Sequence, residues 1–214
     1  MKEIDVTKLS IGDAYKLLIG TIVPRPIAWV STISAKGQVN LAPFSFFNGV
    51  CSNPPSVLFC PVNHPDGSKK DTLRNIQETK QFVINIATEK LALAVNETSG
   101  NYPPEINEFE IAKLTPIPSI RVKPPRIKES PIHMECELLQ IVPVGTGEFA
   151  ARERTGSGHI VIGKLVYYHI TEGAMNEKGH IFLEKINPIA RLGGSFYCPI
   201  RDVFELPRPQ NKKG

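Results

Sequence analysis

The sequence predicts a mainly β fold, an antiparallel β-barrel with a few helices attached to it. Short apolar runs outnumber helix-like segments, and several of these runs are joined by short turns. The 19 prolines are spread along the chain, and proline disfavours long helices. No repeat or long linker divides the 214 residues. We therefore expect a single domain over residues 1–214, with its core between about residues 10 and 200 and a loose C-terminal tail.

A short helix is predicted near the N-terminus, from Ser10 to Leu18. The side chain of Ser10 can cap this helix by accepting a backbone N–H. Ala14, Leu17 and Leu18 share one helical face.

Apolar runs at residues 27–33, 39–42 and 56–62 predict the first strands. Pro43 cannot donate a hydrogen bond to a neighbouring strand, so we expect a bulge or a sheet edge there. The run at 56–62 is apolar throughout, as in a strand of the core.

Polar residues from Asn63 onward mark a change in the middle of the chain. Asp71 or Thr72 can cap a helix that runs to about Thr79. A strand is predicted at 81–87, a helix at 89–98, and a proline-rich loop with one short helix over 99–130.

Two further strands are predicted in the last third. Residues 131–144 alternate apolar and polar side chains, as a half-buried antiparallel strand does. Residues 159–170 form the next strand, with a bulge at Gly163.

Composition argues against several classes of function. The net charge of +4 allows an anionic ligand but does not demand nucleic acid. The basic segment 121–131 lacks aromatic residues on which bases could stack. The N-terminus has no apolar run long enough for a signal peptide or a membrane span. We expect a cytoplasmic protein without nucleic-acid or membrane partners.

The cysteines point to no metal site. They show no C-x-x-C spacing and lie near no histidine at metal-ligand spacing. We expect buried thiols, without a disulfide, at Cys51, Cys60, Cys136 and Cys198.

Three tempting motifs favour a structural interpretation. Residues 145–150 fit G-x-G-x-x-A, but the helix that a dinucleotide-binding fold requires does not follow, so we predict a loop between antiparallel strands. Residues 155–159 lack the spacing of a hydrolase nucleophile elbow. His133 and His169 fall in strands without a neighbouring acid or nucleophile, and we expect both to be structural.

Residues 25–55 are polar yet nearly uncharged, with Lys36 as the only charge after Arg25. Small residues and a proline bulge can free backbone groups to meet a flat heteroaromatic ring. Ser31 and Thr32, together with Lys69 and Lys70 before a helix start, could bind its phosphate. A plain core strand pair is the alternative interpretation of the same residues.

Four segments together resemble the flavin reductase-like family. They are "RPIAWVST", "NLAPFSFFNGVCSNPP", "KKDT" and "INPIARLGGSFY", in this order between about residues 10 and 200. This family has the FMN-binding split-barrel fold, a mainly antiparallel Greek-key β-barrel with attached helices. It includes flavoredoxins and the reductase components of two-component monooxygenases.

The resemblance implies a set of flavin-binding residues and neither a catalytic side chain nor a metal. Residues near the flavin tail and its phosphate would be Trp29, Ser31, Thr32, Lys70, Asp71 and Thr72. Residues around the isoalloxazine ring and ribityl chain would be Asn40, Ala42, Pro43, Ser45, Phe46, Asn48, Cys51 and Ser52, with Cys51 given no redox role. Arg191 and the turn at 193–194 would approach the flavin, either within the same chain or from the second subunit of a homodimer.

The resemblance also implies an activity. The chain would be an NAD(P)H-dependent flavin reductase, passing a hydride from NADH or NADPH to N5 of FMN, with FAD as a possible substitute. A monooxygenase or another acceptor protein could take the electrons. The alternatives are a flavoredoxin-like electron-transfer protein with tightly bound FMN and a protein partner, and a non-catalytic flavin-binding module.

Overall fold

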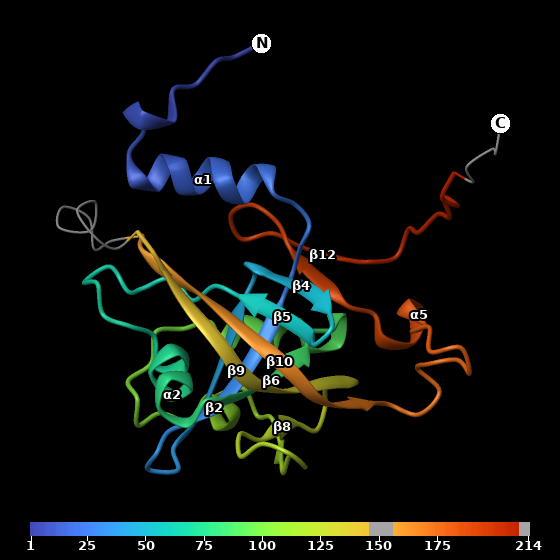
Figure 1. Ribbon diagram of the computed structural model, residues 1–214. Helices are drawn as coiled ribbons and strands as arrows, with labels where there is room; N and C mark the ends of the chain where they lie inside the picture. Colours follow the sequence, from blue (N-terminus) through green and yellow to red (C-terminus); the bar gives the residue numbers. More distant parts are fainter. Residues whose placement is uncertain (146–155, 210–214) are drawn as a thin grey trace.

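A seven-stranded antiparallel sheet organises the protein (Figure 1). The computed structural model describes residues 1–145 and 156–209. The strand order is β3-β2-β6-β9-β10-β5-β4. These strands are β2 (Ala28–Ile33), β3 (Val39–Phe44), β4 (Phe47–Ser52), β5 (Pro55–Phe59), β6 (Gln81–Ile86), β9 (Ile132–Val144) and β10 (Gly158–Ile170). The prediction of an antiparallel barrel with attached helices is confirmed.

Two small sheets complete the β structure. One joins β1 (Arg25–Pro26), β11 (Ile189–Arg191) and β12 (Tyr197–Pro199), and the other joins β7 (Pro116–Ile117) and β8 (Arg126–Ile127). The antiparallel pairing of β1 with β11 sets Arg25 opposite Arg191. This pairing places the start of the polar segment 25–55 beside the C-terminal part of the chain.

The helices are short and lie outside the sheet. They are α1 (Ile11–Thr21), α2 (Asp71–Thr79), α3 (Ala92–Glu97), α4 (Glu108–Ile111), α5 (Leu183–Ile186) and the 3-10 helices Val6–Lys8 and Glu89–Leu91. Helix α2 packs on β2 and β3 through the buried side chains of Leu73 and Ile76. Within residues 1–145 and 156–209, none of the helices has the length and apolar character to cross a membrane.

The predicted bulge at Gly163 is confirmed. The pairing of β10 with β9 shifts register between Ile162 and Gly163. A Cβ atom on Gly163 would clash with the ring of Phe82, which lies fully buried at the centre of the core. The bulge and the missing side chain therefore leave room for this ring, which packs edge-on against Phe59 at 5.4 Å between centroids.

The predicted N-terminal helix is confirmed, and it continues past Leu18 to Thr21. Ser10 caps the helix by accepting the N–H of Asp13, as expected. Leu17 and Leu18, however, are 39% and 45% exposed, and Ile19 is the buried residue of α1. The helix stands off the barrel instead of covering it (Figure 1), so its apolar residues have few partners within the described chain.

The predicted half-burial of residues 131–144 is wrong over the first part of β9. Met134 and Cys136 face the core, and His133 and Glu135 on the opposite side are buried as well. Burial lowers the pKa of His133 to about 4, so this imidazole is neutral and its Nε2–H donates to the Ile127 carbonyl at 2.7 Å. The structural interpretation of His133 is supported by this contact.

The remaining sequence predictions have mixed outcomes. The segments that flank 145–150 are antiparallel neighbours, as expected, although 146–150 themselves lie outside the described residues. Cys136 is buried, Cys60 and Cys198 are half-buried, and Cys51 is exposed on β4. The prediction of a buried thiol is therefore wrong for Cys51, because the outer edge of β4 has no neighbouring strand.

Candidate functional site

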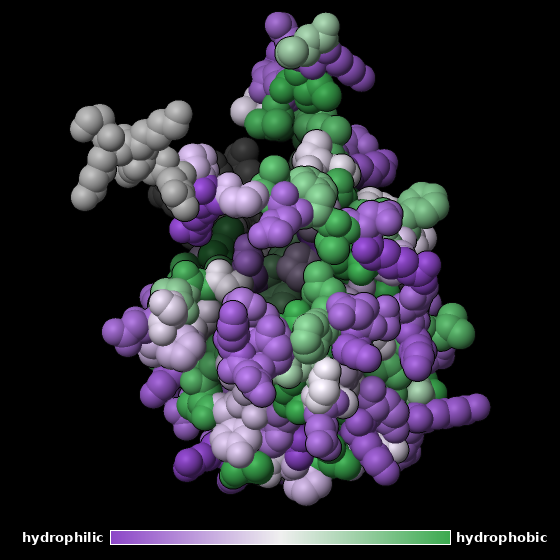
Figure 2. Space-filling view, turned by 90° about the vertical axis from the view of Figure 1, so that its right-hand side faces the viewer, coloured by the Kyte–Doolittle hydropathy of each residue, from purple (hydrophilic) through white to green (hydrophobic). Residues whose placement is uncertain are grey.

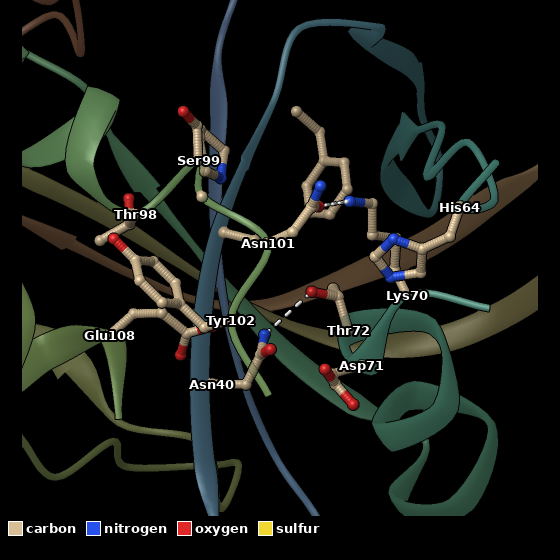
Figure 3. A pocket seen from close by; sticks show the side chains of 14 residues that line it. Asn40, His64, Lys70, Asp71, Thr72, Thr98, Ser99, Asn101, Tyr102 and Glu108 are labelled. Carbon is tan, nitrogen blue, oxygen red and sulfur yellow. Dashed lines mark hydrogen bonds between the residues drawn. The ribbon is translucent and has the colours of Figure 1, made fainter. Parts of the chain in front are cut away.

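A polar pocket lies where edge strand β3 meets the start of α2 (Figure 3). It has a volume of about 70 Å³. Three segments far apart in the sequence form its walls, together with His64 and Glu108. The lining residues are Asn40, Ala42, Pro43, Phe44, His64, Lys70, Asp71, Thr72, Thr98, Ser99, Gly100, Asn101, Tyr102 and Glu108. The pocket thus brings together six predicted residues: Asn40, Ala42, Pro43, Lys70, Asp71 and Thr72.

The edge position of β3 makes this pocket possible. Pro43 lies on the outer edge of the sheet, as its missing N–H predicts. The outward N–H of Leu41 has no strand to pair with and instead donates to Glu108 Oε2 at 3.1 Å. The Glu108 carboxylate of α4 thus accepts the backbone N–H of Leu41 at this edge. The part of β3 that follows Leu41 stays open to the pocket.

The N-terminus of α2 faces the pocket without a side-chain cap. Lys70 occupies the N-cap position and makes no capping hydrogen bond with its side chain. Its carbonyl accepts the N–H groups of Leu73 and Arg74. Within the described chain, the N–H groups of Asp71 and Thr72 have no acceptor. Two free N–H groups and the positive end of the helix dipole favour an anion at this point.

Lys70 supplies a positive charge beside these N–H groups. Its ammonium donates to Asn101 Oδ1 at 2.9 Å. Burial lowers the pKa of Lys70, and the nearby Asp71 partly opposes this effect. The Asp71 carboxylate is itself paired with Arg74 in the first turn of α2. The lysine is therefore available to an incoming anion.

A buried amide and hydroxyl network holds β3 and α2 together behind the pocket. Asn40 donates through Nδ2 to Thr72 Oγ1 at 2.9 Å and to Thr32 Oγ1 at 3.3 Å. Asn75 of α2 donates to the same Thr32 oxygen at 3.0 Å. Thr32 is fully buried, so its role is to position Asn40 and α2.

Glu108 adds a buried carboxyl group to the lining of the pocket. The residue is 7% exposed. Burial raises the pKa of its carboxyl, against the opposing effect of backbone hydrogen bonds that include that of Leu41. This carboxyl therefore gains the negative charge that would repel an anion at the start of α2 only at a higher pH than an ordinary glutamate does.

The side chains of Trp29 and Ser31, predicted to lie near a flavin tail, do not line the pocket. Trp29 is fully buried and donates from Nε1 to Thr98 Oγ1 at 2.9 Å. Ser31, also fully buried, donates to the carbonyl of Pro125 at 2.5 Å. Both side chains, like Thr32, lie behind the pocket and support its walls.

A wider cleft of about 250 Å³ adjoins the pocket and shares Pro43 and Ser99 with it. Its other lining residues are Tyr15, Ile27, Ser45, Val95, Asn96, Arg191 and Tyr197. The Arg191 guanidinium lies over the Tyr197 ring, 4.4 Å from its centroid, and donates to the Gly194 carbonyl at 2.6 Å. The predicted residues Pro43, Ser45 and Arg191 therefore meet in one cleft next to the pocket.

Besides Trp29, Ser31 and Thr32, four further predicted residues line neither of these two sites. Phe46 borders an apolar cleft beneath α1. Asn48, Cys51 and Ser52 are exposed on β4, the other edge strand of the sheet. A single chain does not bring them to the pocket.

Sequence reasoning missed eight residues of the pocket: Phe44, His64, Thr98, Ser99, Gly100, Asn101, Tyr102 and Glu108. Most of them lie in segments with loop-like composition, which carry no periodic signal. The one usable signal in the sequence is Gly100, because a glycine in a loop can mark a close approach to the backbone. In the structure, a Cβ atom at this position would lie 2.7 Å from the Tyr102 ring. A glycine in this loop lets the tyrosine fold back over the pocket.

Taken together, the seven-stranded antiparallel sheet, the attached helices and the pocket at its β3 edge define a split-barrel protein. The flavin reductase-like domain matches residues 19–185. The chain belongs to the flavin reductase-like family, as its sequence motifs suggested.

Relatives cover nearly the full length of the chain. A protein of Aquifex aeolicus (strain VF5) is 42% identical over 90% of this chain and 93% of its own. The crystal structure of nitrilotriacetate monooxygenase component B from Bacillus cereus is 40% identical, with a TM-score of 0.89 over 96% of this chain and 98% of that one. The structure of 2-nitrobenzoate 2-nitroreductase NbaA from Pseudomonas fluorescens is 31% identical, with a TM-score of 0.84 over 98% of both chains.

Proposed function

We propose that this chain is an NAD(P)H-dependent flavin reductase that binds FMN or FAD across the pocket and the adjoining cleft. One observation carries the proposal beyond family membership. The uncapped start of α2, with Lys70 beside it, opens directly next to a cleft wide enough for a flat ring. A phosphorylated planar ligand needs these two features side by side.

The donors of the pocket fit a phosphate. Two backbone N–H groups, the Thr72 hydroxyl and the Lys70 ammonium surround one small space. Charge-assisted hydrogen bonds of this kind are about twice as strong as neutral ones. The Asn40 and Thr32 network holds these donors in place before a ligand arrives.

The residues of the cleft fit the ring of a flavin. Ile27, Pro43 and Val95 supply apolar surface, and Ser45 and Arg191 supply polar groups at its rim. A bound flavin supplies the redox chemistry, because its N5 accepts a hydride from reduced nicotinamide. The chain has to orient the ring and leave one face accessible, so no side chain need act as a nucleophile or acid.

We further propose that the active species is a homodimer with the flavin near the interface. Tyr15 of α1 borders the ring cleft, and the same helix exposes Leu17, Leu18 and Ile22. Figure 2 shows apolar surface on the N-terminal segment that projects from the top of the molecule. Light scattering after gel filtration measures the mass; a monomer at micromolar concentration would contradict this part of the proposal.

Enzyme assays test the activity directly. The purified protein is mixed with FMN or FAD and with NADH or NADPH, and the loss of reduced nicotinamide is followed by absorbance. We expect oxidation that depends on both the protein and the flavin. No oxidation with any of the four combinations would contradict the proposal.

The similarity to a monooxygenase component favours a reductase that serves a partner enzyme. Retention of flavin separates this role from that of an electron-transfer protein with a permanent cofactor. A reductase that supplies flavin loses it during gel filtration and shows saturation kinetics with free FMN. A protein that keeps its flavin through the column fits the flavoredoxin-like alternative.

A further inference from the structure

We propose that the segment Ser99–Tyr102, held to Lys70 by a hydrogen bond, selects FMN over FAD by closing the phosphate end of the pocket. This inference rests on the proposed function and narrows its ligand. We call residues 99–102 the wall, and the hydrogen bond from Lys70 Nζ to Asn101 Oδ1 the clasp.

The clasp joins two elements that come from distant parts of the chain. Lys70 is the N-cap residue of α2, and Asn101 follows α3 by four positions. Their side chains meet at 2.9 Å. Figure 3 shows the clasp as a dashed line beside the pocket, with Thr72 and Asp71 on one side and Tyr102 on the other.

The wall is built from fixed contacts and is not a loose loop. The Ser99 hydroxyl donates to the Asn96 carbonyl at 2.6 Å, and the Gly100 N–H donates to the Glu97 carbonyl at 3.2 Å. The Tyr102 hydroxyl donates to the same Glu97 carbonyl at 3.1 Å.

Two further contacts, one at Thr98 and one at Gly100, help to hold the wall in place. Thr98, directly before the wall, accepts a hydrogen bond from the buried Trp29. Gly100 has no Cβ, which would lie 2.7 Å from the Tyr102 ring, so backbone and ring approach closely. The wall is therefore in place before any ligand binds.

The enclosed space matches a terminal phosphate. A water molecule needs roughly 10–15 Å³ on this scale, so the 70 Å³ pocket holds only a few waters. FMN ends in a phosphate monoester with a charge of about −1.5 to −2 and three free oxygens. The free N–H groups of α2, the Thr72 hydroxyl and Lys70 suit those oxygens.

FAD places different demands on the same site. Its first phosphate continues into a second phosphate and an adenosine, which must leave the pocket at the phosphate end. The wall and the clasp occupy that end. FAD binding therefore requires the clasp to open and the wall to shift, and the bridging phosphate brings less charge to the helix N-terminus.

Binding assays with two flavins and two matched amide variants test the inference. Asn101→Ala removes the clasp. Gln77→Ala is the control, because Gln77 Oε1 accepts a hydrogen bond from Lys69 at 3.0 Å on α2 but does not line the pocket. Dissociation constants for FMN and FAD are measured by quenching of flavin fluorescence, together with the melting temperature of each variant.

We expect the wild-type protein to bind FMN at least about tenfold more tightly than FAD. In Asn101→Ala the ratio of the two constants should fall by about fivefold or more, and in Gln77→Ala it should not change. Tyr102→Ala, which shortens the wall, should lower the ratio in the same direction and covers the case in which Asn101→Ala fails to fold.

Equal affinity of the wild-type protein for both flavins would overturn this inference and leave the proposed function standing. A ratio that stays the same in Asn101→Ala and in Tyr102→Ala would also overturn it. Binding of neither flavin would overturn the proposed function, and this inference with it.

Discussion

Two clusters of polar side chains differ in how the protein uses their polar atoms: one lies on the sheet, and the other lies where β3 meets the start of α2. One, which we call the roofed cluster, consists of Ser31, Asn85 and Glu135, and is covered by residues 118–127. The other, which we call the open cluster, consists of Asn40, Lys70 and Thr72, and lines the pocket. The members of both come from segments that look similarly polar in the sequence.

In the roofed cluster, the backbone of the chain itself satisfies the polar atoms. The fully buried Glu135 carboxylate accepts the N–H groups of Ile120, Arg121 and Val122 at 2.8, 2.6 and 3.2 Å. Asn85 Oδ1 accepts the N–H of Ile127 at 2.9 Å. These hydrogen bonds hold the loop at residues 118–127 against the sheet. They therefore use the polar atoms that a ligand would otherwise contact.

In the open cluster, hydrogen-bond donors are held in position, but some of them have no acceptor within the described chain. Asn40 and Thr72 bond to each other, while the first N–H groups of α2 stay without an acceptor in the described chain. The comparison teaches that polarity on a strand does not by itself mark a binding site. A site appears where the protein orients donors and then leaves them unpaired.

Glu135→Ala should have the largest effect on stability. It removes a buried carboxylate from three N–H groups and from His169 Nε2, which lies 2.6 Å away. We expect the free energy of unfolding to fall by about 3 kcal/mol, as measured by urea denaturation. Glu137→Ala, an exposed change on the same strand, is the control and should cost little.

The same residue predicts how stability depends on pH. Burial raises the pKa of Glu135, but the hydrogen bonds from His169 and from the loop outweigh it, so the net effect is a pKa below the ordinary 4.5. Its contribution is thus present above pH 4.5 and is lost as the pH falls through the lowered value. The stability difference between wild type and Glu135→Ala should shrink on acidification, and a constant difference would contradict the assignment.

Lys70→Ala should have the largest effect on binding. The loss of one charge-assisted hydrogen bond, about 1.5–3 kcal/mol, corresponds to a 10- to 150-fold weaker affinity for FMN. Lys69→Ala is the matched control, because Lys69 bonds to Gln77 outside the pocket. An unchanged dissociation constant for Lys70→Ala would remove this lysine from the site.

Thr32→Val tests the support behind the pocket. The change removes the hydroxyl oxygen that accepts from both Asn40 and Asn75. We expect a loss of about 1–2 kcal/mol in stability and a smaller decrease in FMN affinity than for Lys70→Ala. Thr115→Val, at an exposed threonine, should change neither; a wild-type melting temperature for Thr32→Val would count against the network.

Glu108→Gln should have the smallest effect, which is visible only as a pH dependence. Burial raises the pKa of Glu108, so this carboxyl gains its charge at higher pH than an ordinary glutamate. As the pH rises through that value, the new negative charge should weaken FMN binding in the wild type. The Gln variant should lack this loss, and parallel pH profiles for the two proteins would refute the role of Glu108.

Local rules predicted part of the site from the sequence. The helix that runs to Thr79 and the edge position of Pro43 depend on neighbouring residues, and both predictions are confirmed. The predicted cap is wrong, because Lys70 and neither Asp71 nor Thr72 occupies the N-cap position. The partners of the polar side chains are distant: Ser31 bonds to Pro125, 94 positions away, and Leu41 to Glu108, 67 positions away. The sequence therefore identified polar residues near the site but did not separate those that hold the fold from those that face the pocket.

The errors in the fold have the same cause. The alternation in residues 131–144 correctly indicated a strand, but it gave no sign that a loop would bury the polar face at His133 and Glu135. The apolar face of α1 correctly indicated a helix, yet Leu17 and Leu18 find no cover in the described chain.

A comparison of FMN with riboflavin tests the central claim most directly, because the two ligands differ only in the phosphate. We expect FMN to bind at least about tenfold more tightly than riboflavin to the wild-type protein. This advantage should be largely lost in Lys70→Ala, while the affinity for riboflavin stays the same. Equal affinities of the wild-type protein for FMN and riboflavin would contradict a phosphate site at the start of α2.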